Sequence, residues 1–365
     1  MRRETDEVAG AVVDAIYEAG QLPEINALLR SILENDDPIP PGLPARARAY
    51  FDETDDLPPW ADAQRIRRAQ EIFSEYGVYI TYGLFASSLP QAYASASGAS
   101  VLVETGAMLD RVRQRIFETA QFLFDVLDVG GLEPDGRGIR AAQRVRLMHA
   151  AIRKLILSSP RLAWDVEARG LPINQEDMIG TLMTFSTITW DALGRFGVDL
   201  PKEDADAWIH HWCVIGHFLG IRRELMPHDI YDAQELTEAI RQRQWAPSEQ
   251  GKRLAAALVD MMQEFFTRDA PILDGVMPTV IRYLAGDQCG DLLGLPPTDW
   301  TITLVDAFRG VTDLFQDRGR DELIQEELGK AALRAMRFIT DVERGHKNAS
   351  FRIPESLRRS VIPGT

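Results

Sequence analysis

The stretch Arg144-Val145-Arg146-Leu147-Met148-His149-Ala150-Ala151-Ile152-Arg153 predicts a helix with one unusual face. Arg146, His149 and Arg153 are separated by three and four residues, so they lie along one helical stripe. The stripe also carries side chains apolar enough to face a core, namely Val145, Ile152 and Ile156. An imidazole among aliphatic side chains, flanked by guanidinium groups, suits a site that binds iron through a neutral nitrogen while the arginines hold nearby carboxylates.

Two interpretations of this histidine remain open from the residues alone. A single histidine on a helix is more often a core residue with satisfied hydrogen bonds than a metal ligand. The flanking arginines favour the ligand, because two nearby cations disfavour a third positive charge and so favour the neutral, metal-binding imidazole. In the alternative interpretation, Arg146 and Arg153 simply reach aspartate or glutamate residues on neighbouring helices.

The composition is that of an ordinary globular protein. The chain has 365 residues, of which 45% are hydrophobic and 26% are charged, and this length allows a large core. Its formal net charge of −15 argues against binding to nucleic acid or to anionic membranes. Two distant cysteines, Cys213 and Cys289, suit a reducing compartment. Because no signal-like apolar run follows the first residues and no apolar stretch reaches ~18 residues, we expect a cytoplasmic protein without a membrane span.

Almost every long segment has helical periodicity and none shows sustained alternation, which predicts an all-α fold in a single large helical domain. Residues 87–100 are small and polar, so a loop or short turn near a cavity is expected there. Asn174 and Asp177 have the spacing of a capping box at the start of a helix. An irregular region is expected from 268 to 300. One or two helices are expected over 5–34, and single helices over 44–53, 61–86, 104–128, 139–158, 174–196, 203–225, 232–243, 248–267, 300–317 and 320–344.

A second candidate face lies on the helix expected over 104–128. Arg115, Glu118 and Thr119 share this face at spacings of three and four residues, and it continues to Phe122. Spacing alone favours a surface pair of arginine and glutamate, which contributes only a few tenths of a kcal/mol.

A third candidate is formed by His210, Cys213 and His217 on the helix expected over 203–225, at spacings that could serve a transition metal. One straight helix cannot surround a tetrahedral ion, and no CxxC or HExxH motif accompanies these residues, so histidines hydrogen-bonded to the backbone are the favoured interpretation. No EF-hand loop, Walker motif, GxSxG elbow or ExxH pair is present, which leaves hydrolase and di-iron functions little support.

Taken together, these features resemble the MpaB-type oxygenases, a family that includes the catalytic domain of rubber oxygenases (latex-clearing proteins). The resemblance runs from about Phe51 to Leu258 and more loosely to the C-terminus, and the order and spacing of its motifs make it specific. The most specific motif is Arg146-x-x-His149-x-x-x-Arg153, preceded by Arg115-x-x-x-Thr119. The other motifs are TDDLPPWAD (54–62), LPQAY (89–93) with Gly98 and ETG (104–106), GLPINQED (170–177) with Thr181, Phe185 and Ser186, and Trp212-x-x-x-Gly216-x-x-Leu219-Gly220-Ile221.

The resemblance implies a globin-like core around haem b. The core would cover 51–265, with accessory helices over 1–50 and C-terminal helices over 266–365 packed on it. His149 matches the family's proximal iron ligand, and Arg146 and Arg153 match the arginines that flank it at the cofactor. Arg115 and Thr119 match distal positions near the oxygen site.

The resemblance also implies a reaction, the oxidative cleavage of a C=C bond in a hydrophobic isoprenoid substrate by O2. Arg115, Glu118 and Thr119 would act on the oxygen side of the haem. Glu118 stands where rubber-cleaving members carry a lysine that can close the sixth coordination position, and the loop SGAS (97–100) offers no match for the family's proposed distal acid. Both departures concern rubber cleavage rather than haem binding. The alternative is a protein that binds haem or an apolar ligand without oxygenase turnover.

Overall fold

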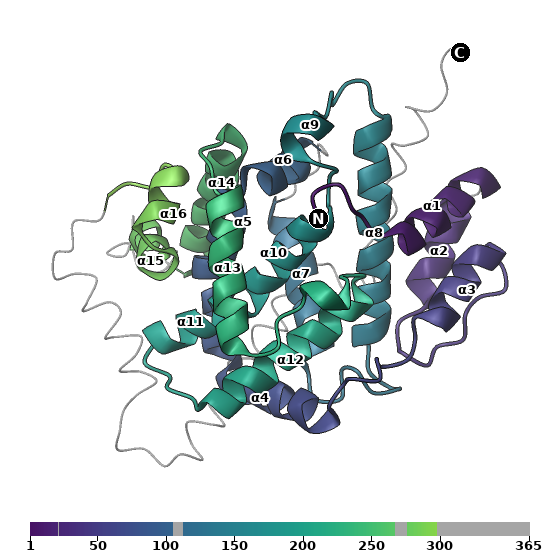
Figure 1. The fold of residues 1–365 in the computed structure, drawn as a ribbon, viewed down its shortest axis with the longest axis horizontal. Coiled ribbons are helices and arrows are strands. Elements are labelled where there is room, and N and C mark those ends of the chain that lie inside the picture. The colour runs from purple at the N-terminus through teal and green to yellow at the C-terminus, as the bar shows by residue number, and fades with distance from the viewer. Residues whose placement is uncertain (21, 105–111, 267–275, 298–365) are drawn as a thin grey trace.

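Helices form the regular structure of the computed structural model, which describes residues 1–20, 22–104, 112–266 and 276–297 (Figure 1). Within these ranges no β-strand occurs, and an isolated bridge between Ser95 and Trp245 is the only β pairing. The predicted all-α fold in a single helical domain is therefore confirmed, whereas the globin-like core remains a prediction. Across the same ranges, no helix combines the length and the apolar character that a membrane crossing requires.

The helices have the following bounds in chain order. The first half contains α1 (Glu7–Ala19), α2 (Leu22–Ser31), α3 (Ala45–Glu53), α4 (Ala63–Gly83), the π-helix η1 (Leu84–Ser88), α5 (Leu89–Ala94), α6 (Ala96–Glu104), α7 (Val112–Leu127) and α8 (Gly138–Ser158). The second half contains α9 (Val166–Arg169), α10 (Gln175–Phe185), α11 (Thr187–Arg195), α12 (Lys202–Phe218), the 3₁₀-helix η2 (Arg223–Leu225), α13 (Ile230–Gln244), α14 (Glu249–Phe266), α15 (Val276–Ala285) and α16 (Asp287–Leu292). The helices predicted over 300–317 and 320–344 lie outside the described residues.

The long helix α8 is buried on two faces. On one face Leu147, Ala150 and Ala151 pack against apolar side chains of α1, α2 and α3. On the other face Val145 and Met148 belong to the central hydrophobic cluster, together with side chains of α4, α7, α10, α12 and α13. A third cluster joins α5, α6, α14, α15 and α16, and α14 to α16 lie on the opposite side of the molecule from α1 to α3 (Figure 1).

The prediction of a loop or short turn over 87–100 is wrong, because η1 leads directly into α5 and α6 follows after Ser95. Its position near a cavity is confirmed, since Gln91, Ser95 and Gly98 line one. Pro90 is tolerated in the first turn of α5, where a backbone N–H has no acceptor within the helix. The serine hydroxyls of η1 bond to distant segments instead of exposing a loop to water. Ser87 donates to the carbonyl of Leu284 at 2.9 Å, and Ser88 lies 3.1 Å from the hydroxyl of Thr189. Tertiary packing therefore decides the structure here.

Three predicted helix boundaries also need correction. The helix expected over 174–196 breaks at Ser186, whose carbonyl accepts a hydrogen bond at 3.1 Å from the indole N–H of Trp208 on α12. Helix α12 ends at Phe218 rather than near 225, since Gly220 has a φ of +84° that cannot continue a helix. Helices α15 and α16 occupy part of the region in which irregular structure was expected.

Candidate active site

An apolar cavity of about 300 Å³ is lined by α5, α6, α7, α8 and by α10 to α13. Its volume is at the lower end of the range for sites that bind small molecules and cofactors. Aromatic, aliphatic and thioether side chains form most of the wall, among them Phe122, Met148, Met183, Phe185, Trp212 and Ile240. The cavity can therefore hold an apolar ligand or the apolar body of a larger one.

His149 lies on this wall, on the face of α8 that belongs to the central cluster. Val145, Met148, His149 and Ile152 all line the cavity, and their spacing of three and four residues makes them one helical face. The Nδ1 atom of His149 is buried. Because the opposite face of α8 is packed against the N-terminal helices, the backbone that carries this imidazole is held from both sides.

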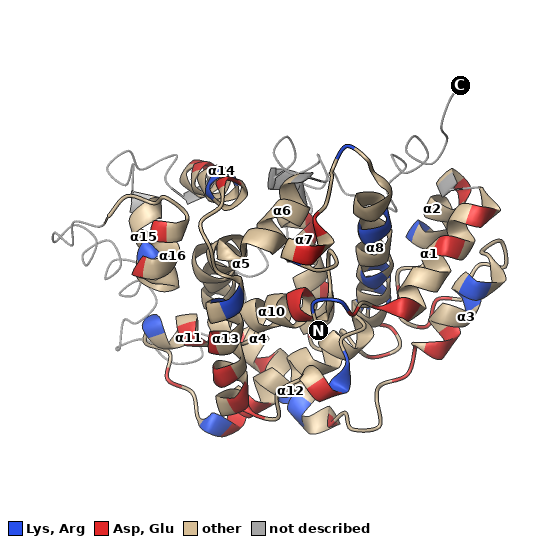
Figure 2. Cartoon of the chain, turned by 45° about the horizontal axis from the view of Figure 1, so that its top comes forward, with Lys and Arg blue, Asp and Glu red and all other residues tan. Residues whose placement is uncertain are grey.

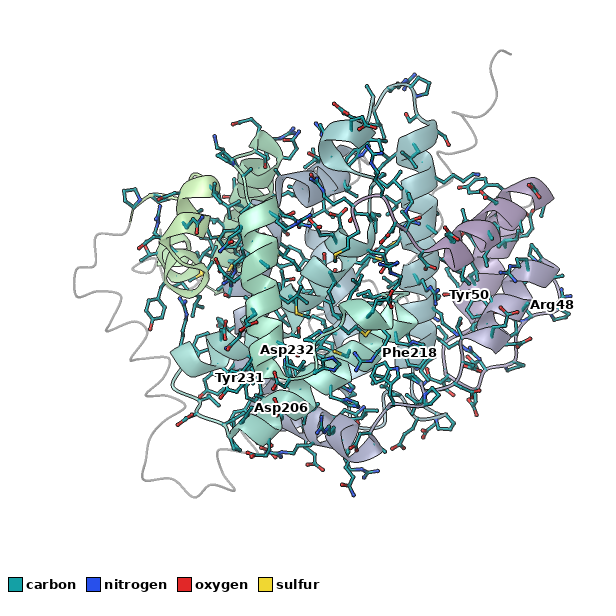
Figure 3. All side chains as sticks on the ribbon, in the orientation of Figure 1. Arg48, Tyr50, Asp206, Phe218, Tyr231 and Asp232 are labelled. Atoms are coloured by element: carbon teal, nitrogen blue, oxygen red, sulfur yellow. The ribbon has the colours of Figure 1, made fainter. Side chains whose placement is uncertain are left out.

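The arginines that flank His149 bind protein groups. Nε and Nη2 of Arg146 donate to the Asp6 carboxylate at 2.5 and 2.9 Å, and the guanidinium lies 5.6 Å from the ring centre of Tyr50. Basic positions along α8 and the acidic start of α1 lie beside one another in Figure 2. Tyr50 points from α3 toward α8 in Figure 3, and its hydroxyl donates to the carbonyl of Gln143 at 3.0 Å. Arg146 therefore connects α8 to both α1 and α3.

Arg153 has a similar role on the following turns of α8. Its Nε donates to the carbonyl of Pro172 at 3.1 Å, and its Nη2 donates to the carbonyl of Ile173 at 2.7 Å. Neither Arg146 nor Arg153 is among the described residues that line the cavity. Both guanidinium groups thus fix the position of α8. Arg146 does so through a carboxylate, as in the alternative interpretation, whereas Arg153 does so through backbone carbonyls.

Helix α7 contributes Glu118 and Thr119 to the cavity wall, together with Phe122 one turn further along. Glu118 is only 4% exposed, so the surface pair that spacing alone favoured is wrong for this residue. The Glu118 carboxyl therefore lies where it can contact a ligand held in the cavity. The side chain of Arg115 lies outside the described residues.

The histidines of α12 have structural roles. His210 Nε2 accepts a hydrogen bond from the backbone N–H of Asp62 at 2.8 Å, and His211 Nε2 lies 2.9 Å from the carbonyl of Val126. Burial lowers the pKa of His211 to about 4, so its ring is neutral at physiological pH. The thiol of Cys213 donates to the carbonyl of Pro227 at 3.6 Å. The contact of His210 matches the backbone-bonded histidine favoured from the sequence, and Cys213 is bonded to the backbone as well. His217 instead lies edge-on to Trp60, with 6.2 Å between the ring centres.

Several polar residues on the cavity wall were not predicted as site residues from the sequence. Gln91, Arg241 and Gln244 line the cavity, as does Asp177, which the sequence indicated only as a capping-box partner. Burial raises the pKa of Asp177 to about 7, while hydrogen bonds from Asn174 oppose this rise. The motifs LPQAY and GLPINQED contained two of these positions, but no local signal connects them to α13.

The donor set near His149 is compatible with haem. In the part of the chain that the structure describes, no group of three His, Cys, Asp or Glu residues is arranged to hold a metal ion. A single imidazole on an apolar wall suits a cofactor that brings its own equatorial ligands and needs one axial ligand from the protein. His149 is the described residue that meets this requirement.

A helical domain that carries one imidazole and a buried carboxyl on the wall of an apolar cavity belongs to the class of proteins that enclose an apolar substrate or cofactor. Residues 70–315 match the family model of the "ER-bound oxygenase mpaB/B'/Rubber oxygenase, catalytic domain". The chain belongs to this family of oxygenases, which confirms the resemblance based on the motifs.

Two relatives extend this result. The rubber oxygenase of Streptomyces sp. (strain K30) is 30% identical over 294 residues, which cover 80% of this chain and 70% of the relative. The structure of latex clearing protein LCP in the closed state superposes with a TM-score of 0.73 at 23% identity. That superposition covers 97% of this chain and 95% of the other, and it shows that the two share a fold.

Proposed function

We propose that this protein is a haem b-dependent oxygenase that cleaves a C=C bond in a hydrophobic isoprenoid substrate, with His149 as the iron ligand. The observation that carries the proposal is that His149 from α8 and Glu118 and Thr119 from α7 line the same apolar cavity. Family membership supports the reaction class. The relative named rubber oxygenase supports an isoprenoid alkene as the substrate class and O2 as the co-substrate.

When bound, a haem would supply redox-active iron for chemistry with O2. Residues of the chain supply the surroundings. Thr119 brings a hydroxyl that can donate a hydrogen bond, and Glu118 brings a carboxyl that can hold or release a proton. Phe122 and Phe185 offer apolar surface to the alkene and exclude water from it. Arg115 remains a predicted participant on the oxygen side.

Arg146 and Arg153 contribute to cofactor binding through α8 in this proposal. By holding Asp6 and the carbonyls of Pro172 and Ile173, they set the position of the helix that presents the imidazole. We therefore expect that substitution of either arginine weakens haem affinity without abolishing it, because the ligand itself remains.

The ligand assignment is tested by haem titration of the purified protein. The wild type should bind one haem and develop a Soret band, whereas His149→Ala should lose the band. His210→Ala is a matched control, because His210 is hydrogen-bonded to the backbone of Asp62 and does not line the cavity. Stoichiometric haem of unchanged spectrum in His149→Ala would refute the assignment.

The oxygen-side assignment is tested by Thr119→Val, which removes the hydroxyl and keeps the side-chain volume. The variant should bind haem normally. With squalene, an isoprenoid alkene supplied as an aqueous dispersion, it should consume O2 more slowly than the wild type. Unchanged O2 consumption would show that Thr119 has no role there.

One observation favours a second function, the binding of haem or an apolar ligand without turnover. Glu118 is buried on the wall at the position where rubber-cleaving members carry a lysine, so the oxygen side differs from theirs. A haem-loaded protein that consumes no O2 with any alkene would support this second function.

A further inference from the structure

The cavity has a polar end, and that end lies at its mouth. Thr181 on α10 is exposed to solvent and lines the cavity, so the cavity reaches the surface beside it. Trp212 and Ile188 line it too but are only 1% and 2% exposed, which places them deep inside. Arg241 and Gln244 of α13 line the cavity and are half-buried, as expected at a rim.

Arg241 is the one lysine or arginine among the described residues of the cavity wall. Its Nη2 donates to Oε1 of Gln91 at 2.6 Å, and its guanidinium lies 5.3 Å from the ring centre of Trp245. Among the described residues Glu238 forms an ion pair with Arg241 at 3.6 Å and is 56% exposed. The positive charge of Arg241 also opposes the burial-induced rise in the pKa of Asp191. Nε of Arg241 is buried and has no hydrogen-bond partner among the described residues.

Gln91 and Gln244 supply amide groups to the same cavity wall as Arg241. Ser95 donates to Oε1 of Gln244 at 2.9 Å, which directs Nε2 of Gln244 toward Glu176 and Asp177 at long distances of 3.5 Å. The Asp177 carboxyl accepts hydrogen bonds from the side-chain amide of Asn174 at 2.9 Å and from its backbone N–H at 3.3 Å. Burial raises the pKa of Asp177 to about 7, so its negative charge is weakened at neutral pH.

We propose that this mouth binds a carboxylate, with Arg241 as its cation and the apolar chain of the same ligand directed into the cavity. A planar guanidinium matches a carboxylate in two hydrogen bonds, and a half-exposed rim spares the carboxylate full desolvation. The inference rests on the proposed function for the identity of the ligand's apolar chain, which would be isoprenoid. Two sources share this chemistry, an isoprenoid acid that serves as substrate and a propionate of the haem.

The first test compares the binding of trans,trans-farnesoic acid with that of its methyl ester, by calorimetry at pH 7 on the full-length protein as purified. The acid should bind the wild type about tenfold more tightly than the ester, the size of one charge-assisted hydrogen bond. Arg241→Gln should lose this preference while its affinity for the ester stays the same. Arg253→Gln, which removes an exposed arginine from α14, is the matched control and should keep the preference.

The second test measures haem affinity by Soret titration of the same variants. A tenfold loss in Arg241→Gln with no loss in Arg253→Gln identifies the propionate as the carboxylate, even where acid and ester bind alike. Arg241→Lys keeps the charge but not the planar guanidinium that donates two hydrogen bonds at once. Relative to Arg241→Gln, it should restore part of the preference for the acid or part of the affinity for haem. The proposal is overturned when Arg241→Gln changes neither the preference for the acid nor the affinity for haem. The acid-and-ester comparison needs no haem, so a colourless protein would contradict the proposed function alone.

Discussion

Replacing Asp6 with asparagine removes the charge that holds α1 against α8. The Asp6 and Arg146 side chains are only 5% and 10% exposed, and two hydrogen bonds of 2.5 and 2.9 Å join them. Asp6 is also the N-cap of α1, where its carboxylate accepts from the N–H of Ala9. Because asparagine is as good an N-cap as aspartate, Asp6→Asn keeps the cap while it removes the ion pair with Arg146.

The expected loss follows from the burial of Arg146. Removing one partner of a buried ion pair leaves an uncompensated charge and costs about 3–5 kcal/mol. This is a large fraction of the free energy of unfolding of a typical domain, roughly 5–15 kcal/mol. Urea unfolding followed by circular dichroism measures this loss of stability. The urea concentration at the midpoint should fall while the m-value stays the same.

Asp14→Asn is the matched control on the same pair of helices. Asp14 pairs with Lys154 of α8, but the two side chains are 56% and 33% exposed. An exposed pair of this kind contributes at most about 1 kcal/mol. A loss for Asp6→Asn that is no larger than the loss for Asp14→Asn would refute the conclusion that the buried pair anchors α1.

Two further predictions concern a glycine and a buried acid. Gly220→Ala should destabilise the fold by roughly 1–3 kcal/mol in thermal unfolding, since an alanine would be strained at its φ. Its φ is +84°, and an added Cβ would lie 2.5 Å from Asp6 and 2.6 Å from Arg146. Gly194→Ala, with open space around it, should cost nothing, and equal losses would contradict this reasoning. The folded-state pKa of Asp177, about 7, is higher than its ordinary value of 3.8, so the folded protein holds a proton that the unfolded chain releases. Its contribution to stability is complete below about pH 4 and is lost as the pH rises to 7, so the wild type should weaken relative to Asp177→Asn by at most about 1.4 kcal/mol per pH unit. A stability difference that stays constant across this range would contradict the assignment.

The sequence predicted those elements whose signals are local. The periodicity of 139–158 corresponds to α8 (Gly138–Ser158), and the capping box at Asn174 and Asp177 is present at the start of α10. Prediction from the sequence failed where contacts between residues far apart in the chain decide the structure. Helices α5 and α6 are short and rich in small residues, and bonds such as that between Ser87 and Leu284 hold η1 in place before them.

The candidate site was predictable in part. The apolar residues around His149 indicated a buried face, and Val145 and Ile152 do line the cavity with it. The partners of the arginines were not predictable, since Asp6 is 140 residues away from Arg146. The polar mouth was missed for the same reason, because Gln91 and Arg241 are 150 residues apart and the motif LPQAY, which contains Gln91, gives no signal that connects it to α13.

The central claim is that His149 holds the iron of a haem in this cavity. Diffraction from crystals of the haem-loaded protein, collected at the iron absorption edge, locates the metal directly. We predict a single anomalous peak inside the cavity, within bonding distance of a ring nitrogen of His149 and on the side of α8 that carries Val145 and Ile152. A peak bonded to any other residue, or haem bound outside the cavity with His149 free of it, would contradict the account.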